Sequence, residues 1–118
     1  MLSSPKQCQD EKIITWIIPC FNEEEVIDET FERIVKVCKS IEKYKWEIIF
    51  IDDGSTDFTS KKIKALIQKR KGLTYIGLSR NYGHQIAVQA GLSNFVGDAA
   101  IIIDADLQDP PELAIDFL

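Results

Sequence analysis

The sequence has few of the residues that mark disulfide-rich, zinc-binding or nucleic-acid-binding proteins. Its 118 residues include three scattered cysteines, Cys8, Cys20 and Cys38, and a single histidine. An odd number of cysteines without a Cys-x-x-Cys pair indicates neither a disulfide framework nor a zinc site. The 14 basic residues are outnumbered by 19 acidic ones, which gives a formal net charge of −5. A chain of that charge is poorly suited to a phosphate backbone, so we expect no nucleic-acid partner.

Long apolar runs are also absent. No stretch approaches the roughly 18 residues of a membrane span, and residues 1–12 lack the apolar centre of a signal peptide. We therefore expect a cytoplasmic chain with a loose tail at residues 1–12. The remainder, residues 13–118, has the composition of one globular domain, since 45% of the chain is hydrophobic and 28% is charged.

Short apolar runs alternate with amphipathic stretches along this domain. Four short apolar runs predict strands, and the first two are typical of strands buried on both faces. The four runs are residues 13–18, 46–51, 73–78 and 99–103. Apolar residues at helical spacing follow each of the first three runs. The alternation predicts an α/β fold with an open parallel sheet and helices on both faces.

Local signals give the expected ends of these helices. Asn22 and Glu25 have the spacing of a capping box, and the helix that follows them is expected to run to about Lys43. Gly72 is expected to close the second helix. Pro110 and Pro111 are suited to the first turn of a fourth helix.

Polar clusters follow all four predicted strands directly. They contain Asn22 and Glu23, then Asp52 and Asp53, then Ser79, Arg80 and Asn81, and finally Asp104, Asp106 and Gln108. Carboxyl ends of parallel strands lie along one edge, where open α/β sheets bind ligands. We expect the strand order 3-2-1-4, because it brings the acids after the first and fourth strands into one crevice.

Asp104 and Asp106 are the strongest candidates for a metal site. They flank Ala105 after three isoleucines, so two like charges emerge together from an apolar strand. A cation would relieve their repulsion, and oxygen ligands of this kind suit Mg²⁺ or Mn²⁺. Gln108 offers a further oxygen. The alternative is that Asp104 only caps a loop.

The Asp52-Asp53-Gly54 segment has a structural and a functional interpretation. Asp-Gly forms a turn, and Ser55 or Asp57 can cap the following helix. That leaves one carboxylate, which we assign to Asp52, to accept hydrogen bonds from a base or ribose.

Familiar phosphate-binding loops are missing. The segment after the first strand contains no Gly-x-Gly-x-x-Gly, which argues against NAD chemistry, and the chain has no P-loop. A diphosphate at this acidic edge would need a divalent metal and a cation such as Arg80. We expect His84 to cap or pack the third helix, and Cys20 lacks the partner base of a cysteine hydrolase.

Four segments together resemble, in order and spacing, family 2 glycosyltransferases of the GT-A fold. They are residues 18–24, 52–57, 78–83 and 104–112, the last reading Asp-Ala-Asp-Leu-Gln-Asp-Pro-Pro-Glu. The likeness is strongest to the polyprenyl-phosphate branch, which includes bactoprenol glucosyltransferases and dolichol-phosphate mannose synthases.

The resemblance implies a metal-dependent, inverting transfer of a hexose from a nucleotide sugar, with uridine favoured, to a polyprenyl phosphate. It implies a membrane-associated parent enzyme that acts at the cytoplasmic face in cell-envelope glycan synthesis. Residues 13–118 would be the nucleotide-sugar-binding half, with no catalytic residue of the acceptor side. The implied nucleotide-binding residues are Pro19, Phe21, Glu23, Asp52, Asp53, Arg80, Asp104 and Ala105. The implied metal ligands are Asp104, Asp106 and Gln108.

Other functions stay open at this point. A nucleotide-binding module without catalysis would carry the same residues, and a family 2 enzyme acting on a sugar hydroxyl would share the donor half. A receiver-like phosphoacceptor domain also uses acids at strand ends, but the chain has no suitable lysine after a later strand.

Overall fold

The computed structural model describes residues 12–106 and 110–113. They contain a four-stranded parallel sheet in the order β3-β2-β1-β4, as the sequence predicts. Its strands are β1 (Lys12–Cys20), β2 (Tyr44–Asp52), β3 (Leu73–Gly77) and β4 (Ala99–Ile102). In register, Cys20 lies opposite Asp52 and Asp52 opposite Gly77, so three strands end at the same level of one edge.

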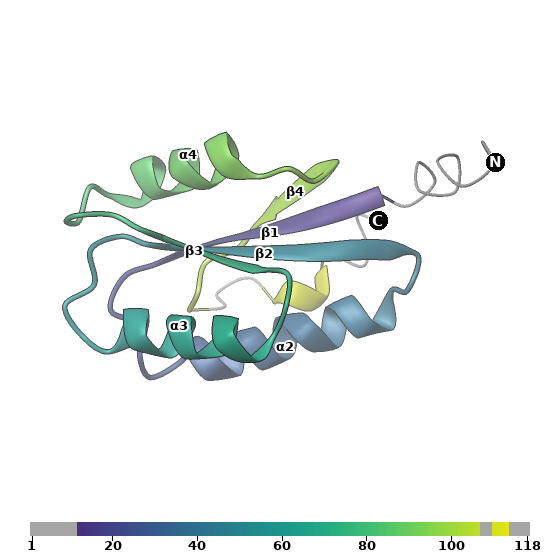
Figure 1. Cartoon of the computed structure of the whole chain (residues 1–118), viewed down its shortest axis with the longest axis horizontal. Helices are drawn as coiled ribbons and strands as arrows, with labels where there is room; N and C mark the ends of the chain where they lie inside the picture. Colours follow the sequence, from purple (N-terminus) through teal and green to yellow (C-terminus); the bar gives the residue numbers. More distant parts are fainter. Residues whose placement is uncertain (1–11, 107–109, 114–118) are drawn as a thin grey trace.

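Helices cover both faces of the sheet, again as expected. Helices α2 (Ile27–Ser40) and α3 (Thr59–Lys69) lie together on one face, and α4 (His84–Asn94) lies on the other (Figure 1). A 3-10 turn, η1 (Pro111–Leu113), packs near α2. Within the described ranges, no helix is long and apolar enough to cross a membrane.

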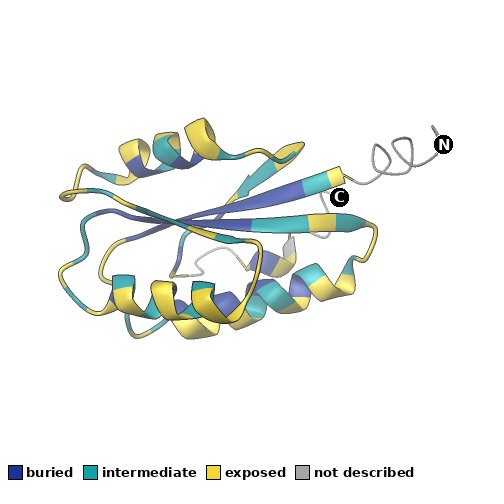
Figure 2. Ribbon diagram, viewed as in Figure 1, coloured by how far each residue is buried: buried dark blue, intermediate teal, exposed yellow. Residues whose placement is uncertain are grey.

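The continuous apolar runs arise because the central strands are buried from both sides (Figure 2). Trp16 and Ile18 of β1 pack toward α2 and α3 with Phe50, and Ile17 packs toward α4 with Ala87. Burial of each large apolar side chain stabilises the fold by about 1.5–3 kcal/mol. Alternating side chains of β1 therefore pack into two hydrophobic clusters, one on each face of the sheet.

Helix α4 approaches the sheet closely because it carries a glycine at the contact. A Cβ on Gly91 would lie 2.5 Å from Ile17 Cγ2 and 2.9 Å from Ile51 Cδ1. Gly91 is buried, and so is Ala87 one turn earlier. This contact leaves α4 little freedom to slide along the sheet.

Strand β1 runs through Pro19 to Cys20, two residues beyond the apolar run 13–18 that predicted it. The Ile17 carbonyl accepts a hydrogen bond from the Ile103 N–H on the β4 side. The Cys20 carbonyl accepts one from the Asp53 N–H on the β2 side. Backbone groups alternate sides along a strand, so Pro19 faces the β4 side, beyond the last residue that β4 pairs. Proline has no N–H to donate there, and the pairing with β4 goes no further than Ile17.

The capping box predicted from Asn22 and Glu25 is wrong. Helix α2 begins at Ile27 after Val26, without a side-chain cap, and ends at Ser40 rather than near residue 43. Asn22 instead has a left-handed backbone (φ 52°), and its Oδ1 accepts a bond from the Thr56 N–H. Its side chain therefore joins two loops and caps no helix. The predicted fourth helix is represented only by η1, and the rest of it lies outside the described residues.

Candidate active site

A pocket of about 330 Å³ opens at the carboxyl edge of the sheet, where β1, β2 and β4 end and α4 begins. It brings together Glu23 and the Asp104–Asp106 turn, as the predicted strand order requires. The predicted site residues that line it are Pro19, Phe21, Glu23, Asp53, Asp104 and Asp106. The other lining residues are Cys20, Asn81, Gly83, His84 and Ala87. Gln108 lies outside the described residues.

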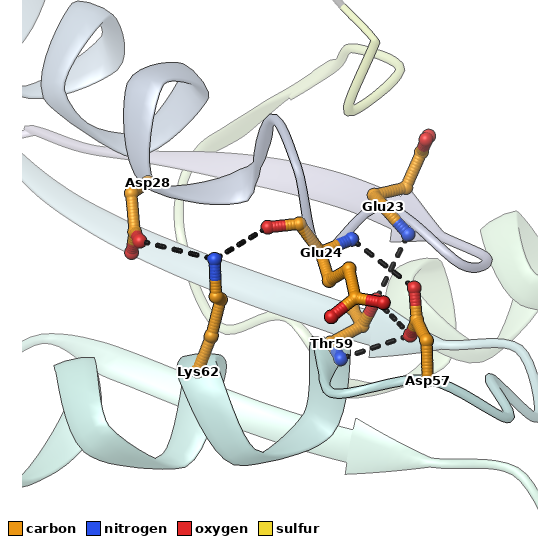
Figure 3. A network of polar contacts seen from close by, with 6 residues as sticks. All are labelled: Glu23, Glu24, Asp28, Asp57, Thr59 and Lys62. Atoms are coloured by element: carbon orange, nitrogen blue, oxygen red, sulfur yellow. Dashed lines mark hydrogen bonds and ion pairs between the residues drawn. The ribbon is translucent and has the colours of Figure 1, made fainter.

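The loop after β1 is held through its main chain. The Glu23 N–H donates to Thr59 Oγ1 at 2.8 Å, and the Glu24 N–H donates to Asp57 Oδ2 at 3.3 Å (Figure 3). Lys62 adds a bond from its ammonium to the Glu24 carbonyl at 2.6 Å. These bonds tie the loop to the start of α3, and the Glu23 side chain points away from them (Figure 3). Asp57 also accepts the Thr59 N–H at 2.9 Å, so it bonds the first turn of α3 as the sequence suggested.

Asp52 and Asp53 are both buried, each only 4% exposed. Asp52 accepts the Ser55 N–H at 2.9 Å and the Tyr75 hydroxyl at 3.0 Å, one bond on each carboxylate oxygen. Burial, followed by this bond to Asp52, raises the pKa of Tyr75 to about 12. The sequence left the Asp52 carboxylate open for a nucleoside, whereas the structure gives both oxygens a donor within the protein. Asp52 does not line the pocket, and its contact with a nucleoside stays a prediction.

Asp53 lines the pocket but also has both oxygens engaged. Oδ1 accepts the Tyr82 N–H at 2.8 Å, and Oδ2 accepts the Gly83 N–H at 3.0 Å. The carboxylate thus holds the loop that leads into α4. Arg80 lies in the same loop, where its guanidinium stacks 4.7 Å from the Tyr82 ring centroid and does not line the pocket.

Asp104 and Asp106 lie on a turn that is anchored at its middle. Ala105 is fully buried, and its carbonyl accepts the hydroxyl of the buried Thr30 of α2 at 2.5 Å. Asp106 is exposed, and the side chain of Asp104 is 46% exposed. The turn therefore directs its two carboxylates into the pocket and its small residue into the core. Ala105 itself does not line the pocket, so its predicted nucleotide contact remains untested by this geometry.

The electrostatics of the pocket favour a cation. Burial raises the pKa of Glu23 above its ordinary value, and the nearby charges of Asp106 and Asp104 raise it further. Among the described residues, no three His, Cys, Asp or Glu side chains lie close enough together to enclose a metal ion. The described donor set fits Mg²⁺ or Mn²⁺, which bind through one or two carboxylates and complete their shell with phosphate oxygens and water.

His84 has a position that the sequence did not assign to it. Its side chain is 60% exposed, which excludes the predicted packing role, and its Nε2 lies 2.7 Å from Asp104 Oδ1. The signal was its place at the start of the third helix, at the same sheet edge. Cys20, in contrast, is buried and its thiol bonds to the Ile18 carbonyl. Burial raises the pKa of the Cys20 thiol well above its ordinary value, so it does not supply a thiolate nucleophile.

Residues 15–116 match the family model of glycosyl transferase family 2. The chain belongs to this family. It is 42% identical over 104 residues to the uncharacterized glycosyltransferase YkcC of Bacillus subtilis, covering 86% of this chain and 31% of that protein. It is equally similar, at 42% over 104 residues, to the undecaprenyl-phosphate 4-deoxy-4-formamido-L-arabinose transferase of Pectobacterium carotovorum, covering 87% of this chain and 32% of that protein. The chain thus spans about a third of the length of these relatives.

Solved structures confirm the GT-A fold. The mannosyltransferase PcManGT of Pyrobaculum calidifontis, in complex with GDP-Man and Mn²⁺, superposes with a TM-score of 0.72 at 25% identity, over 81% of this chain and 28% of that one. Glucosyl-3-phosphoglycerate synthase of Mycobacterium tuberculosis superposes with a TM-score of 0.66 at 24% identity, over 100% of this chain and 42% of that one. The second likeness is one of fold alone.

Proposed function

We propose that this chain is the donor-binding part of an enzyme that transfers a sugar, with inversion, from a nucleotide sugar to a polyprenyl phosphate. The observation that carries the proposal is the pocket in which Glu23, Asp104 and Asp106 converge beside Pro19 and Phe21. The name of the Pectobacterium relative supports the acceptor class. The mannosyltransferase complex supports a nucleotide sugar bound with Mn²⁺.

The pocket offers two kinds of surface, and we assign each to one end of the donor. Pro19 and the half-exposed Phe21 provide an apolar face suited to a flat base, with Glu23 beside them to accept hydrogen bonds. Asp104 and Asp106 provide the carboxylates for a metal-bound diphosphate. Arg80 would have to turn from Tyr82 to reach that diphosphate.

A divalent cation bound at Asp104 and Asp106 would supply Lewis-acid stabilisation of the leaving nucleoside diphosphate. The protein contributes to this step by supplying carboxylates for the cation and by holding them in position. Thr30 fixes the turn through Ala105, and His84 contacts Asp104. Without a cation, the same acids would repel a diphosphate.

The proposed acceptor does not depend on a general base. A polyprenyl phosphate is already an anionic nucleophile, whereas a sugar hydroxyl needs a base to remove its proton. The family resemblance implies a hexose, but the Pectobacterium relative is named for an arabinose derivative, a pentose, so we widen the proposal to a sugar. Association with the cytoplasmic face of a membrane belongs to the same proposal.

Isothermal titration of the chain with UDP and with GDP, each with Mn²⁺ and with excess EDTA, tests the donor half of the proposal. We expect binding only when Mn²⁺ is present, with UDP favoured over GDP on the family resemblance. GDP is the matched alternative because the mannosyltransferase binds GDP-Man. Equal UDP binding in EDTA would contradict the metal role.

Incubation with radiolabelled nucleotide sugar and vesicles containing undecaprenyl phosphate tests transfer. Residues 1–118 alone are expected to bind donor without turnover, because orienting an acceptor accounts for about 7–11 kcal/mol of a barrier and none of the described residues is assigned to that role. Robust formation of glycolipid by this chain would contradict that expectation. Binding without transfer in a chain of the relatives' full length would favour a non-catalytic nucleotide-binding module.

A further inference from the structure

The turn after β2 and the loop before α4 contact each other directly through their backbones. Gly54 has a left-handed backbone (φ +73°), and a Cβ there would lie 2.3 Å from the Arg80 carbonyl carbon and 2.4 Å from the Asn81 nitrogen. Only glycine allows this approach without displacement of the loop. The contact therefore fixes the loop at its beginning.

Asp53, the residue before Gly54, fixes the end of the same loop. Its buried carboxylate accepts the N–H groups of Tyr82 and Gly83, one on each oxygen. Gly83 is the N-cap residue of α4 and has no side-chain cap of its own, and its carbonyl accepts the Ala87 N–H at 3.1 Å. The start of α4 is thus held by a carboxylate from another loop.

His84 is the first residue of α4, and its position follows from these constraints. Ala87 and Gly91 seat the helix on Ile17 and Ile51, which prevents sliding, while Asp53 sets where the helix begins. The His84 side chain is exposed, so no packing around it sets its direction. Its Nε2 nevertheless lies 2.7 Å from Asp104 Oδ1, 20 residues along the chain.

We infer that Asp53 is a positioning residue, which holds His84 against Asp104 through the start of α4 and so orients the Asp104 carboxylate for a metal ion. The inference rests on the proposed function, because it assigns Asp104 to the metal. Partners that orient a metal ligand typically change metal affinity by about 10- to 100-fold when they are removed. Asp53 then affects metal affinity through His84 and Asp104, without contacting the metal itself.

The test compares Asp53→Asn, His84→Ala and the double variant with Gln85→Ala, a matched change at an exposed neighbour in α4. Mn²⁺ affinity in the presence of UDP is measured by electron paramagnetic resonance. We expect both single variants to lose about 10-fold or more in affinity, and the double variant to lose no more than His84→Ala alone. Independent effects would instead multiply in the double variant. His84→Gln, which keeps a donor for Asp104, is expected to recover part of the affinity.

Amide and imidazole NMR signals of the metal-free chain give a second readout. In Asp53→Asn, the Tyr82 and Gly83 amides and the His84 ring signals are expected to shift together, whereas His84→Ala should leave the Tyr82 amide near its original position. His84 is exposed, so its variants remain testable even if Asp53→Asn does not fold.

The two proposals fail in different ways. Absence of Mn²⁺ binding by the unmodified chain would overturn the proposed function, and the NMR comparison would then decide whether Asp53 positions His84. Mn²⁺ binding that Asp53→Asn and His84→Ala leave at the level of Gln85→Ala would overturn the inference alone. Multiplied losses in the double variant, or His84 signals unaffected by Asp53→Asn, would also overturn it.

Discussion

Two pairs of aspartates follow buried strands at the same edge of the sheet, and their surroundings differ sharply. Asp52 and Asp53, after β2, are each 4% exposed, and every carboxylate oxygen accepts a hydrogen bond from the protein. Asp104 and Asp106, after β4, lie in the open pocket, where His84 contacts Asp104. Acids at this edge can therefore hold loops together or face a ligand, and burial distinguishes the two pairs.

The difference follows from where each strand lies. Strand β2 has neighbours on both sides. Its own turn, strand β3 and the loop after β3 supply the donors to its two acids, which are the Ser55 N–H, the Tyr75 hydroxyl, and the Tyr82 and Gly83 N–H groups. Strand β4 is the last in the described sheet and pairs only with β1. The Thr30 hydroxyl fixes its turn from the core side by donating to the Ala105 carbonyl, and the two carboxylates face the pocket. We call Asp52 and Asp53 the buried pair and Asp104 and Asp106 the exposed pair.

Removal of one carboxylate from each pair should give the largest contrast in stability. Asp53→Ala leaves two N–H groups without their acceptor, and hydrogen bonds to charged groups contribute about 1.5–3 kcal/mol each, so we expect a loss of about 4 kcal/mol. Asp106→Ala changes an exposed residue and should cost clearly less than Asp53→Ala. Urea unfolding of both variants measures the difference. Equal losses would remove the distinction between the pairs.

Gly54→Ala should break the contact beside the buried pair. The added Cβ would clash with the backbone of residues 80 and 81, and we expect a cost of about 3 kcal/mol from overpacking and left-handed strain together. Gly72 is the control, because its φ of +81° is similar and its Cβ would lie 3.4 Å from the nearest atom. Gly72→Ala should cost only the strain, about 1 kcal/mol. Thermal unfolding of the two variants would contradict this account if the costs were equal.

Thr30→Val should loosen the exposed pair without changing its acids. Loss of the bond to Ala105 leaves a buried carbonyl unpaired, which costs about 1–2 kcal/mol. We expect weaker Mn²⁺ binding as well, because the turn loses its anchor. Thr74→Val, at an exposed position in β3, is the control for both measurements. Unchanged stability and Mn²⁺ affinity in Thr30→Val would show that the anchor is dispensable.

Glu23 gives the smallest expected effect and a pH dependence of defined sign. Burial and the exposed pair raise its pKa in the folded chain above the ordinary value of 4.5, so ionised Glu23 opposes folding at neutral pH. Glu23→Gln should therefore be more stable than the unmodified chain at pH 7 in EDTA. The gain should shrink as the pH falls through the raised pKa and vanish below 4.5, where Glu23 is protonated in both states. Unfolding curves between pH 3 and pH 7 check this, and a gain that persists at pH 3 would contradict it.

Much of the architecture is predictable because it depends on patterns within short segments. The apolar runs predicted the four strands, and the polar clusters after them predicted one functional edge. Strand order followed from a chemical requirement, that Glu23 and Asp104 share a crevice, and both line the pocket. The segment at 104–112 predicted the family through its resemblance.

What the sequence could not give depends on contacts between distant loops. Asn22 and Glu25 have the spacing of a capping box, but the loop after β2 supplies donors to Asn22 that only the folded sheet brings near. Asp52 and Asp53 are alike in sequence, and their different partners follow from the neighbouring strand and loop. His84 and Asp104 are 20 residues apart and meet only because α4 starts beside the end of β4.

The account rests on the claim that the exposed pair, and not the buried pair, holds a metal together with a nucleoside diphosphate. Titration of Mn²⁺ into the chain with UDP, followed by electron paramagnetic resonance, tests it most directly when the unmodified chain is compared with Asp106→Asn. We predict a bound Mn²⁺ signal that requires UDP and disappears in Asp106→Asn, while the variant still unfolds cooperatively in urea. The same bound signal in Asp106→Asn, or its absence from the unmodified chain, would contradict the claim.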